Sequence, residues 1–173
     1  MASNAGSGDR ILGSLRSDDG IGVVRIEDRF ETGIGELWAA LTDNKRLARW
    51  YGDVEGELRA GGEFRAHLHA SGWEGTGRVE ECEPLRRFVV VSQDPDEPNE
   101  HSTEVTLTGD GDQTTLVVEQ HGPPLDLLWA YGAGLQIHVE DLAAHIAGHE
   151  RSDAKTRFAE LEPAYRDLAA KVS

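Results

Sequence analysis

One histidine falls where a group that binds a ligand or transfers a proton could act inside the fold. His138 lies three residues after Leu135 and four before Leu142. That spacing places it on the apolar face of an amphipathic helix, the face that must pack against the rest of the protein. Its imidazole could therefore reach into an internal pocket. A hydrogen-bonded histidine of the core is the commoner role at such a position, and we keep that alternative.

A second candidate pair lies in the last predicted strand, residues 114–121. One face of that strand carries Val117, Glu119 and His121, and the other carries Leu116, Val118 and Gln120. If the first face points inward, Glu119 and His121 supply an acid–base pair close to His138. If it points outward, both are surface residues. Because each face carries a valine, the alternation leaves both orientations open.

Large aromatic side chains are candidates for the rim of a pocket. They are Trp50, Trp73, Trp129 and Tyr131. Trp73 follows a Ser71–Gly72 turn, and a tryptophan in a turn often borders a pocket, although an exposed ring can also mark a contact with a partner. The candidate ligand-binding set consists of these aromatic residues together with Glu119, His121 and His138.

Metal and thiol chemistry find less support. His145 and His149 have the spacing of two metal ligands on one helix face, but Gly148 should end the helix before His149. A solvated helix end explains the pair better, and we expect no metal and no cofactor. The sole cysteine, Cys82, stands between two glutamates, whose negative charges disfavour a reactive thiolate.

The composition excludes several classes of protein. The chain has 173 residues, with 17 Lys and Arg against 32 Asp and Glu, and a formal net charge of −15. Such a surface does not neutralise phosphates, so we exclude nucleic acid and anionic membranes as partners. The length fits one domain with its own hydrophobic core.

The location of the protein can also be predicted. A single cysteine cannot form an internal disulfide framework, which favours a reducing compartment. No apolar run approaches the roughly twenty residues of a membrane span, and the N-terminus lacks the hydrophobic region of a signal peptide. We therefore expect no membrane insertion and a cytoplasmic location.

The pattern of the chain divides it into three parts. Residues 1–20 are rich in Gly, Ser, Asp and Asn, which predicts a flexible N-terminal arm. From Ile21 apolar and polar residues alternate as in a half-buried strand, and Asp28 falls on the apolar side of that strand. A carboxylate there must be paired, partly hydrated or functional. Residues 21–148 form the main domain, and residues 149–173 form a C-terminal helical tail.

The main domain is predicted to be α+β. Two short helices follow the first strand, with Thr32 and Asp43 as their caps. Turn residues then separate further antiparallel strands, at residues 54–59, 63–70, 75–82, 87–93, 103–108 and 114–121. A long helix, capped by Asp126 and ended by Gly148, closes the domain. A seven-stranded curved sheet around this helix leaves a cavity between the two, and such cavities bind small ligands.

The tail carries an apolar stripe that must be covered. Its residues are Phe158, Leu161, Tyr165 and Leu168. Pro163 should kink or restart the helix. Either the chain's own domain or a second copy can cover the stripe, so a homodimer through the tail is one expectation.

Several stretches, in this order, resemble one known family. They are Leu37 to Asp43, Arg49 to Gly52, Gly61 to Phe64, Gly75 to Val79, Glu83 to Phe88, Gln120 to Gly122 and Asp141 to Gly148. Together they resemble the START-like, or SRPBCC, superfamily, and within it the branch related to the C-terminal domain of the activator of Hsp90 ATPase. The resemblance covers roughly residues 21–148. In that branch the closing helix often opens with Gly-Trp, whereas here Leu135 follows Gly134.

The resemblance implies a helix-grip fold with an internal pocket for an apolar or amphipathic small molecule. It implies no single reaction, because fold does not determine function. We expect the chain to bind a small apolar or aromatic ligand. The first alternative is a cyclase or dehydratase acting on a polyketide-like substrate, with Glu119, His121 or His138 moving protons. The second is a co-chaperone that stimulates an ATPase.

Overall fold

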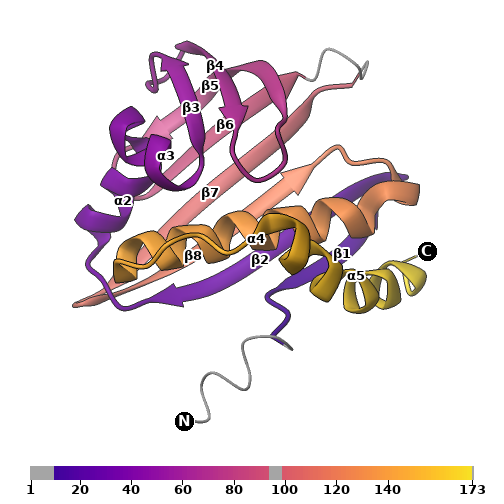
Figure 1. Cartoon of the computed structure of the whole chain (residues 1–173). Helices are drawn as coiled ribbons and strands as arrows, with labels where there is room; N and C mark the ends of the chain where they lie inside the picture. Colours follow the sequence, from indigo (N-terminus) through magenta and orange to yellow (C-terminus); the bar gives the residue numbers. More distant parts are fainter. Residues whose placement is uncertain (1–9, 94–98, 173) are drawn as a thin grey trace, which may run out of the picture.

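The computed structural model describes residues 10–93 and 99–172, and in this part of the chain one antiparallel sheet wraps around a long helix (Figure 1). The strands follow the order β1-β2-β8-β7-β6-β5-β4-β3 across the sheet. Their bounds are β1 (Gly13–Asp18), β2 (Ile21–Phe30), β3 (Gly52–Gly56), β4 (Glu63–Leu68), β5 (Glu74–Glu83), β6 (Arg87–Gln93), β7 (His101–Asp110) and β8 (Gln113–His121). The helices are α2 (Ile34–Thr42), α3 (Asn44–Trp50), the 3₁₀ turn η1 (Leu125–Leu127), α4 (Leu128–Ala147) and α5 (Ala154–Ala170).

The predicted α+β architecture is confirmed, with one strand more than expected. The sheet has eight strands among the described residues, because residues 13–18 form β1 where the sequence predicted part of a flexible arm. β1 pairs with β2 along its whole length, and Leu15 packs against the core. Polar residues such as Arg16 dominate this segment, so its composition did not indicate a strand.

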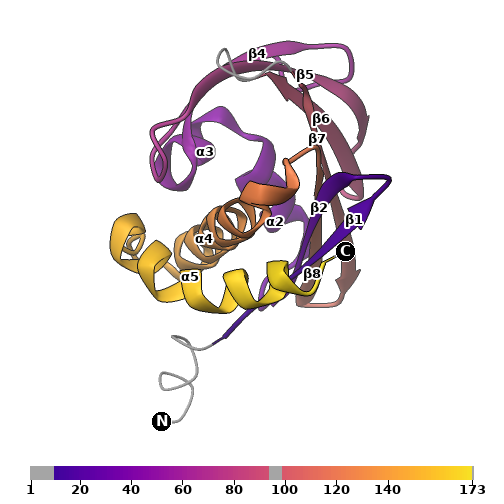
Figure 2. The ribbon, with the colours of Figure 1, turned by 90° about the vertical axis from the view of Figure 1, so that its right-hand side faces the viewer.

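The hydrophobic core lies between α4 and the strands at one side of the sheet. Val24 and Ile26 of β2 have no exposed surface, and they cluster with Leu116 of β8 and with Val139 and Leu142 of α4. Figure 2 shows α4 lying in the hollow of the sheet, which curls away through β6, β5 and β4. Val24 and Ile26, on the apolar face of the first strand predicted from the sequence, therefore form part of the surface on which α4 packs.

Local signals account for most helix boundaries. The Asp43 carboxylate accepts a hydrogen bond from the Lys45 N–H at 2.9 Å and caps α3, as predicted. The predicted cap at Thr32 is wrong, because α2 begins one residue later and Gly33 takes the cap position. The Thr32 carbonyl accepts a hydrogen bond from the Thr114 hydroxyl at 2.8 Å. Gly148 ends α4 with φ at 80°, a conformation that glycine adopts without strain.

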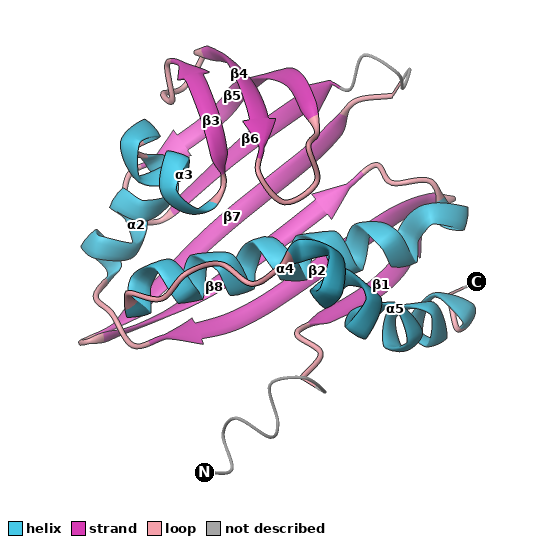
Figure 3. Ribbon diagram, viewed as in Figure 1, coloured by secondary structure: helices cyan, strands magenta, loops and turns pink. Residues whose placement is uncertain are grey.

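The tail helix α5 is covered by its own domain. Leu161 and Tyr165 are fully buried, in a cluster with Ala133 and Ile137 of α4. Figure 3 shows α5 as one helix, and it runs through Pro163, where the sequence predicted a kink or restart. The apolar stripe therefore needs no second copy to cover it, and a homodimer through the tail stays a prediction.

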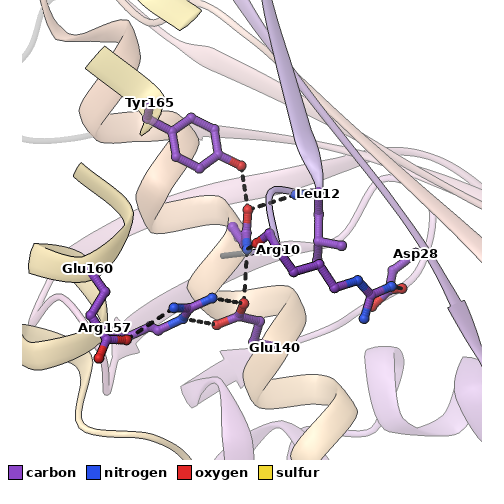
Figure 4. Close-up of polar contacts among 8 residues, drawn as sticks. Arg10, Leu12, Asp28, Glu140, Arg157, Glu160 and Tyr165 are labelled. Carbon is purple, nitrogen blue, oxygen red and sulfur yellow. Dashed lines mark hydrogen bonds and ion pairs between the residues drawn. The ribbon is translucent and has the colours of Figure 1, made fainter. Parts of the chain in front are cut away.

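A fully buried glutamine on α4, Gln136, joins the segment before β1 and the helix α5 to the middle of the fold. Figure 4 labels the four residues that hydrogen-bond to it, which are Arg10, Leu12, Glu140 and Tyr165. The Gln136 Oε1 accepts hydrogen bonds from the Leu12 N–H at 3.0 Å and from the Tyr165 hydroxyl at 2.6 Å. Its Nε2 donates to the Arg10 carbonyl at 2.7 Å and to the Glu140 carboxylate at 2.9 Å. All four hydrogen bonds of this amide are thus made inside the protein.

Glu140, which bonds to Gln136, also forms a partly buried ion pair with α5. Arg157 of α5 donates to both carboxylate oxygens of Glu140, at 2.8 and 2.7 Å, and to Glu160 at 3.0 Å. A bidentate pair of this kind is geometrically specific. It fixes α5 against α4 one turn beyond Gln136. At the other chain end, Arg10 pairs with Asp28 at 2.6 Å, so the carboxylate on the apolar side of β2 is paired, one of the outcomes predicted for it.

We predict that Gln136→Leu destabilises the fold by about 2 to 4 kcal/mol, because it leaves several buried polar groups without partners. The measurement is urea unfolding at pH 7. Gln113→Leu is the matched control, since the Gln113 side chain hydrogen-bonds to Glu31 at the surface, and it should change stability by less than about 0.5 kcal/mol. Equal losses in the two variants would show that the Gln136 amide is not a structural tie.

Candidate functional site

An apolar cavity of about 150 Å³ lies between α4, the helices α2 and α3, and the inner face of the sheet from β3 to β8. Its aromatic walls are Trp50, Tyr51, Phe64 and Phe88. Aliphatic walls come from every side, including Leu47, Val54, Val79, Val105, Leu135 and Leu142. The cavity lies where the strands β3 to β6 curl away from α4.

Helix α3 supplies one end wall. Trp50 is 5 % exposed, and its indole N–H donates to the Ala40 carbonyl at 2.9 Å. This bond satisfies the only polar atom of the indole, so the ring can face an apolar cavity without cost. Trp50 is thus a predicted rim residue that the structure places on the cavity wall.

A β-bulge in β5 determines which side chains of that strand face the cavity. The pairing of β5 with β6 shifts between Val79 and Glu81, so two consecutive glutamates, Glu80 and Glu81, both stay outside. Cys82 then returns to the inner face opposite Phe88, and both line the cavity. Strict alternation would have turned Glu81 inward and Cys82 outward.

A glycine of β5 makes room for an aromatic wall. A β-carbon at Gly77 would lie 2.5 Å from Cζ of Phe64, closer than any real contact. The Phe64 ring therefore lies directly on the backbone of β5 at this point. A larger residue at position 77 would push the Phe64 ring toward the cavity.

His138 lies on the cavity wall and is half-buried. Its ring meets the Tyr51 ring edge to face, with centroids 5.0 Å apart. The Nδ1 atom is shielded from solvent and has no hydrogen-bond partner among the described residues. Burial lowers the pKa of His138 to about 4, so the imidazole is neutral at pH 7. Burial likewise raises the pKa of Tyr51 to about 12 and keeps the phenol protonated.

Glu119 and His121 lie on the opposite face of the sheet. Leu116 and Val118 are the residues of β8 that line the cavity, so the alternating set that contains Glu119 and His121 points outward. The two do interact, with His121 Nε2 3.0 Å from Glu119 Oε1, and Arg16 joins them at 3.3 Å. Of the two orientations that the sequence left open, the structure has the outward one, so Glu119 and His121 form no acid–base pair beside His138.

Trp129 lies between α4 and α5 and does not border the cavity. Its ring packs on Phe158 at 5.8 Å between centroids, and the Arg166 guanidinium lies 3.6 Å above it. This is a cation–π contact that fastens the tail. Trp129 therefore belongs to the tail interface.

Trp73 and Tyr131 also lie away from the cavity wall. The Trp73 ring covers the backbone of Gly75, where a β-carbon would come within 2.3 Å of it. Tyr131 meets the ring of His101 edge to face, with centroids 5.2 Å apart. Of the predicted ligand-binding residues, the structure brings together Trp50 and His138.

The two histidines considered as metal ligands are not paired. His145 Nε2 lies 2.9 Å from Arg46 Nε, so this nitrogen accepts a hydrogen bond from a cation. His149 lies beyond the end of α4. No group of three or more His, Cys, Asp or Glu in the described part of the chain could hold a metal ion. The described residues also include no helix long and apolar enough to cross a membrane.

Most of the cavity wall was not selected from the sequence, including Tyr51, Phe64, Phe88 and Cys82. Phe64 alternates with exposed Arg65 along β4, so the period of the strand is the signal that could have placed it inside. Tyr51 follows the end of α3, where no periodicity applies. Cys82 could not be found by alternation, because the bulge changes the phase of the strand just before it.

A second buried ionisable group lies on α4 outside the cavity wall. Asp141 is 1 % exposed, and no side chain among the described residues hydrogen-bonds to its carboxylate. Burial raises the pKa of Asp141 to about 6, against the opposing effects of the Arg151 charge and of the Ser152 backbone N–H. Asp141 and His138 therefore have pKa values shifted in opposite directions by the same cause.

The antiparallel sheet, its single long helix and the cavity between them define a helix-grip fold of the START-like class. Residues 31–147 match the family model described as Activator of Hsp90 ATPase homolog 1-like protein. The chain belongs to this family, as the sequence resemblance predicted. The comparison with curated proteins gave no match.

Solved structures share the fold over most of the chain. CalU16 from Micromonospora echinospora is 25 % identical, with a TM-score of 0.75 over 92 % of this chain and 96 % of CalU16. DynU16, described as a protein in the dynemicin biosynthetic locus, is 28 % identical, with a TM-score of 0.69 over 79 % of this chain. The match spans 51 % of DynU16. A conserved protein of unknown function from Enterococcus faecalis, 19 % identical, gives a TM-score of 0.71 over 98 % of this chain and 94 % of its own.

We predict a pH-dependent effect of His138→Phe. The folded pKa of His138, about 4, lies below its ordinary value of 6.5, so wild-type stability attributable to this group is lost as pH falls from about 6.5 through 4. As the pH is lowered from 7 to 4, the free energy of unfolding of the variant should therefore rise relative to that of the wild type, by on the order of 3 kcal/mol. Urea unfolding at both pH values measures it, and a difference that does not depend on pH would contradict the prediction.

Asp141→Asn should show the opposite dependence. The folded pKa of Asp141, about 6, lies above its ordinary 3.8, so the stability from this group is present below pH 3.8 and is lost as pH rises through 6. The variant should gain about 2 to 3 kcal/mol relative to wild type between pH 4 and pH 7.5. Asp110→Asn is the control, since the Asp110 side chain is 86 % exposed. A similar profile for both variants would rule out burial of Asp141 as the cause.

Proposed function

We propose that the protein binds a small apolar or aromatic molecule in the cavity between α4 and the curled sheet. The observation that carries the proposal is the cavity itself, which is lined almost entirely by apolar side chains. Concave, mostly apolar sites with a few polar groups are the usual places for small ligands. Buried apolar area supplies most of the affinity of such a site.

The volume limits the size of the ligand. A cavity of about 150 Å³ compares with apolar protein cavities of that size that stay dry and bind benzene. Pockets for drug-sized ligands are larger, roughly 300 to 1,000 Å³. The ligand is therefore compact unless the side chains of the wall move apart to admit it.

Binding is better supported than a cyclase or dehydratase reaction. Proton transfer needs a group within reach of the substrate whose pKa lies near the working pH. Glu119 and His121 lie on the outer face of the sheet, and burial holds the pKa of His138 at about 4. At neutral pH the polar groups of the cavity wall are therefore better suited to forming hydrogen bonds than to transferring protons.

Stimulation of an ATPase is the function in the family's description. The net charge of −15 would allow docking on a basic partner surface. Charge alone identifies no partner, so we rest the proposal on the cavity.

The single cysteine provides a direct test of occupancy, because Cys82 borders the cavity. We predict that toluene slows alkylation of Cys82 by iodoacetamide, about ten-fold when toluene is present at ten times its Kd. Toluene should also raise the thermal midpoint, since it binds the folded state. Mass spectrometry of the intact protein measures the rate of alkylation.

Two phenylalanine substitutions in β8 serve as matched variants. Val118→Phe adds a ring on the cavity face, whereas Val117→Phe adds the same ring on the outer face of the same strand. Val118→Phe should abolish protection by toluene, and Val117→Phe should retain it. If toluene changes neither alkylation nor the thermal midpoint of the wild-type protein, the proposed function is rejected.

A further inference from the structure

The polar side chains of the cavity wall differ in whether they already have hydrogen-bond partners. The Thr42 hydroxyl lines the cavity and donates to the Trp38 carbonyl at 2.7 Å, so its bond is made within α2. The Nδ1 atom of His138 has no partner among the described residues, although it is shielded from solvent. A molecule the size of water does not reach Nδ1, so a ligand in the cavity does not contact this atom directly. Among the described residues Nε2 has no hydrogen-bond partner either, and His138 keeps some exposed surface while it lines the cavity. The imidazole can therefore offer a hydrogen bond to a ligand through Nε2.

The chemistry of this imidazole favours a hydroxyl group as its partner. Because burial keeps His138 neutral at pH 7, one ring nitrogen carries a proton and the other carries a lone pair. A hydroxyl can donate to the lone pair or accept from the N–H, so it pairs with either tautomer. An ionised group on the ligand would be far more costly to bury in this wall.

The rest of the wall favours an aromatic ring. Trp50, Tyr51, Phe64 and Phe88 contribute rings to it, and aromatic rings pack favourably edge to face or offset. The volume of about 150 Å³ accommodates one benzene-sized ring. Tyr51 contacts the His138 ring edge to face, so the polar group is held at an aromatic part of the wall.

We infer that the ligand is a single-ring aromatic compound with one hydroxyl group, and that His138 forms the hydrogen bond to that hydroxyl. This inference rests on the proposed binding function and adds the chemical class of the ligand and the residue that selects it. His138 is thus a residue that determines specificity by pairing with the ligand.

Phenol and toluene test the inference, because they differ by a hydroxyl in place of a methyl group. Wild-type protein should bind phenol at least as tightly as toluene, measured by calorimetry at pH 7. In His138→Phe the affinity for phenol should fall about ten-fold or more, since the hydroxyl is then buried unpaired, while the affinity for toluene should change less than about three-fold. Thr103→Val, which removes another hydroxyl of the wall, should leave the ratio of the two affinities unchanged.

A measurement on the unaltered protein covers the case in which His138→Phe does not fold. The ¹⁵N resonances of the His138 imidazole should shift when phenol binds, and they should shift far less with toluene. Binding of toluene with little or no binding of phenol would overturn the inference and leave the proposed function standing. Binding of neither probe would reject the proposed function. An altered phenol preference in Thr103→Val, with none in His138→Phe, would assign the hydrogen bond to Thr103 and overturn the inference.

Discussion

The mismatch in width between one helix and eight strands is the constraint on which the cavity depends. Strands lie about 4.8 Å apart, so a sheet of this size is roughly 34 Å wide, whereas a helix with its side chains is about 10 to 12 Å wide. A single helix therefore covers only part of the sheet. Here α4 packs on β1 and β2, at one edge of the sheet. The remaining strands must curl over, and α2 and α3 close the end of the hollow that results.

Much of the fold could be predicted from the sequence, because alternation and turn residues specify each strand locally. The failures have physical causes that a local pattern does not contain. β1 was missed because a single apolar residue, Leu15, occupies a mostly polar segment. Cys82 was misplaced because a bulge changes the phase of β5. The orientation of β8 stayed open because Val117 and Val118 make its two faces equally apolar, and only the folded chain shows that Val118 belongs to the core.

The candidate site combines an apolar wall with neutral polar groups. His138 was found from helical spacing alone, because that spacing shows which face of α4 is apolar. Its partners on the wall, Tyr51 and Phe88, come from distant elements, and only the folded chain shows that they meet. Burial keeps both His138 and Tyr51 uncharged at pH 7. The site is therefore suited to recognising a ligand by shape and by a small number of neutral hydrogen bonds.

The position of β2 in the sheet has a consequence for how the protein forms during synthesis. β2 is made early, yet it pairs with β8, with Ile26 opposite Val118. Its apolar face, with Val24 and Ile26, stays uncovered until α4 has also been synthesised. Contacts between such distant parts of a chain slow folding, and they leave apolar, aggregation-prone surface exposed until they form. The core can therefore be completed only after α4 has been synthesised, because Val24 and Ile26 belong to the same cluster as Val139 and Leu142.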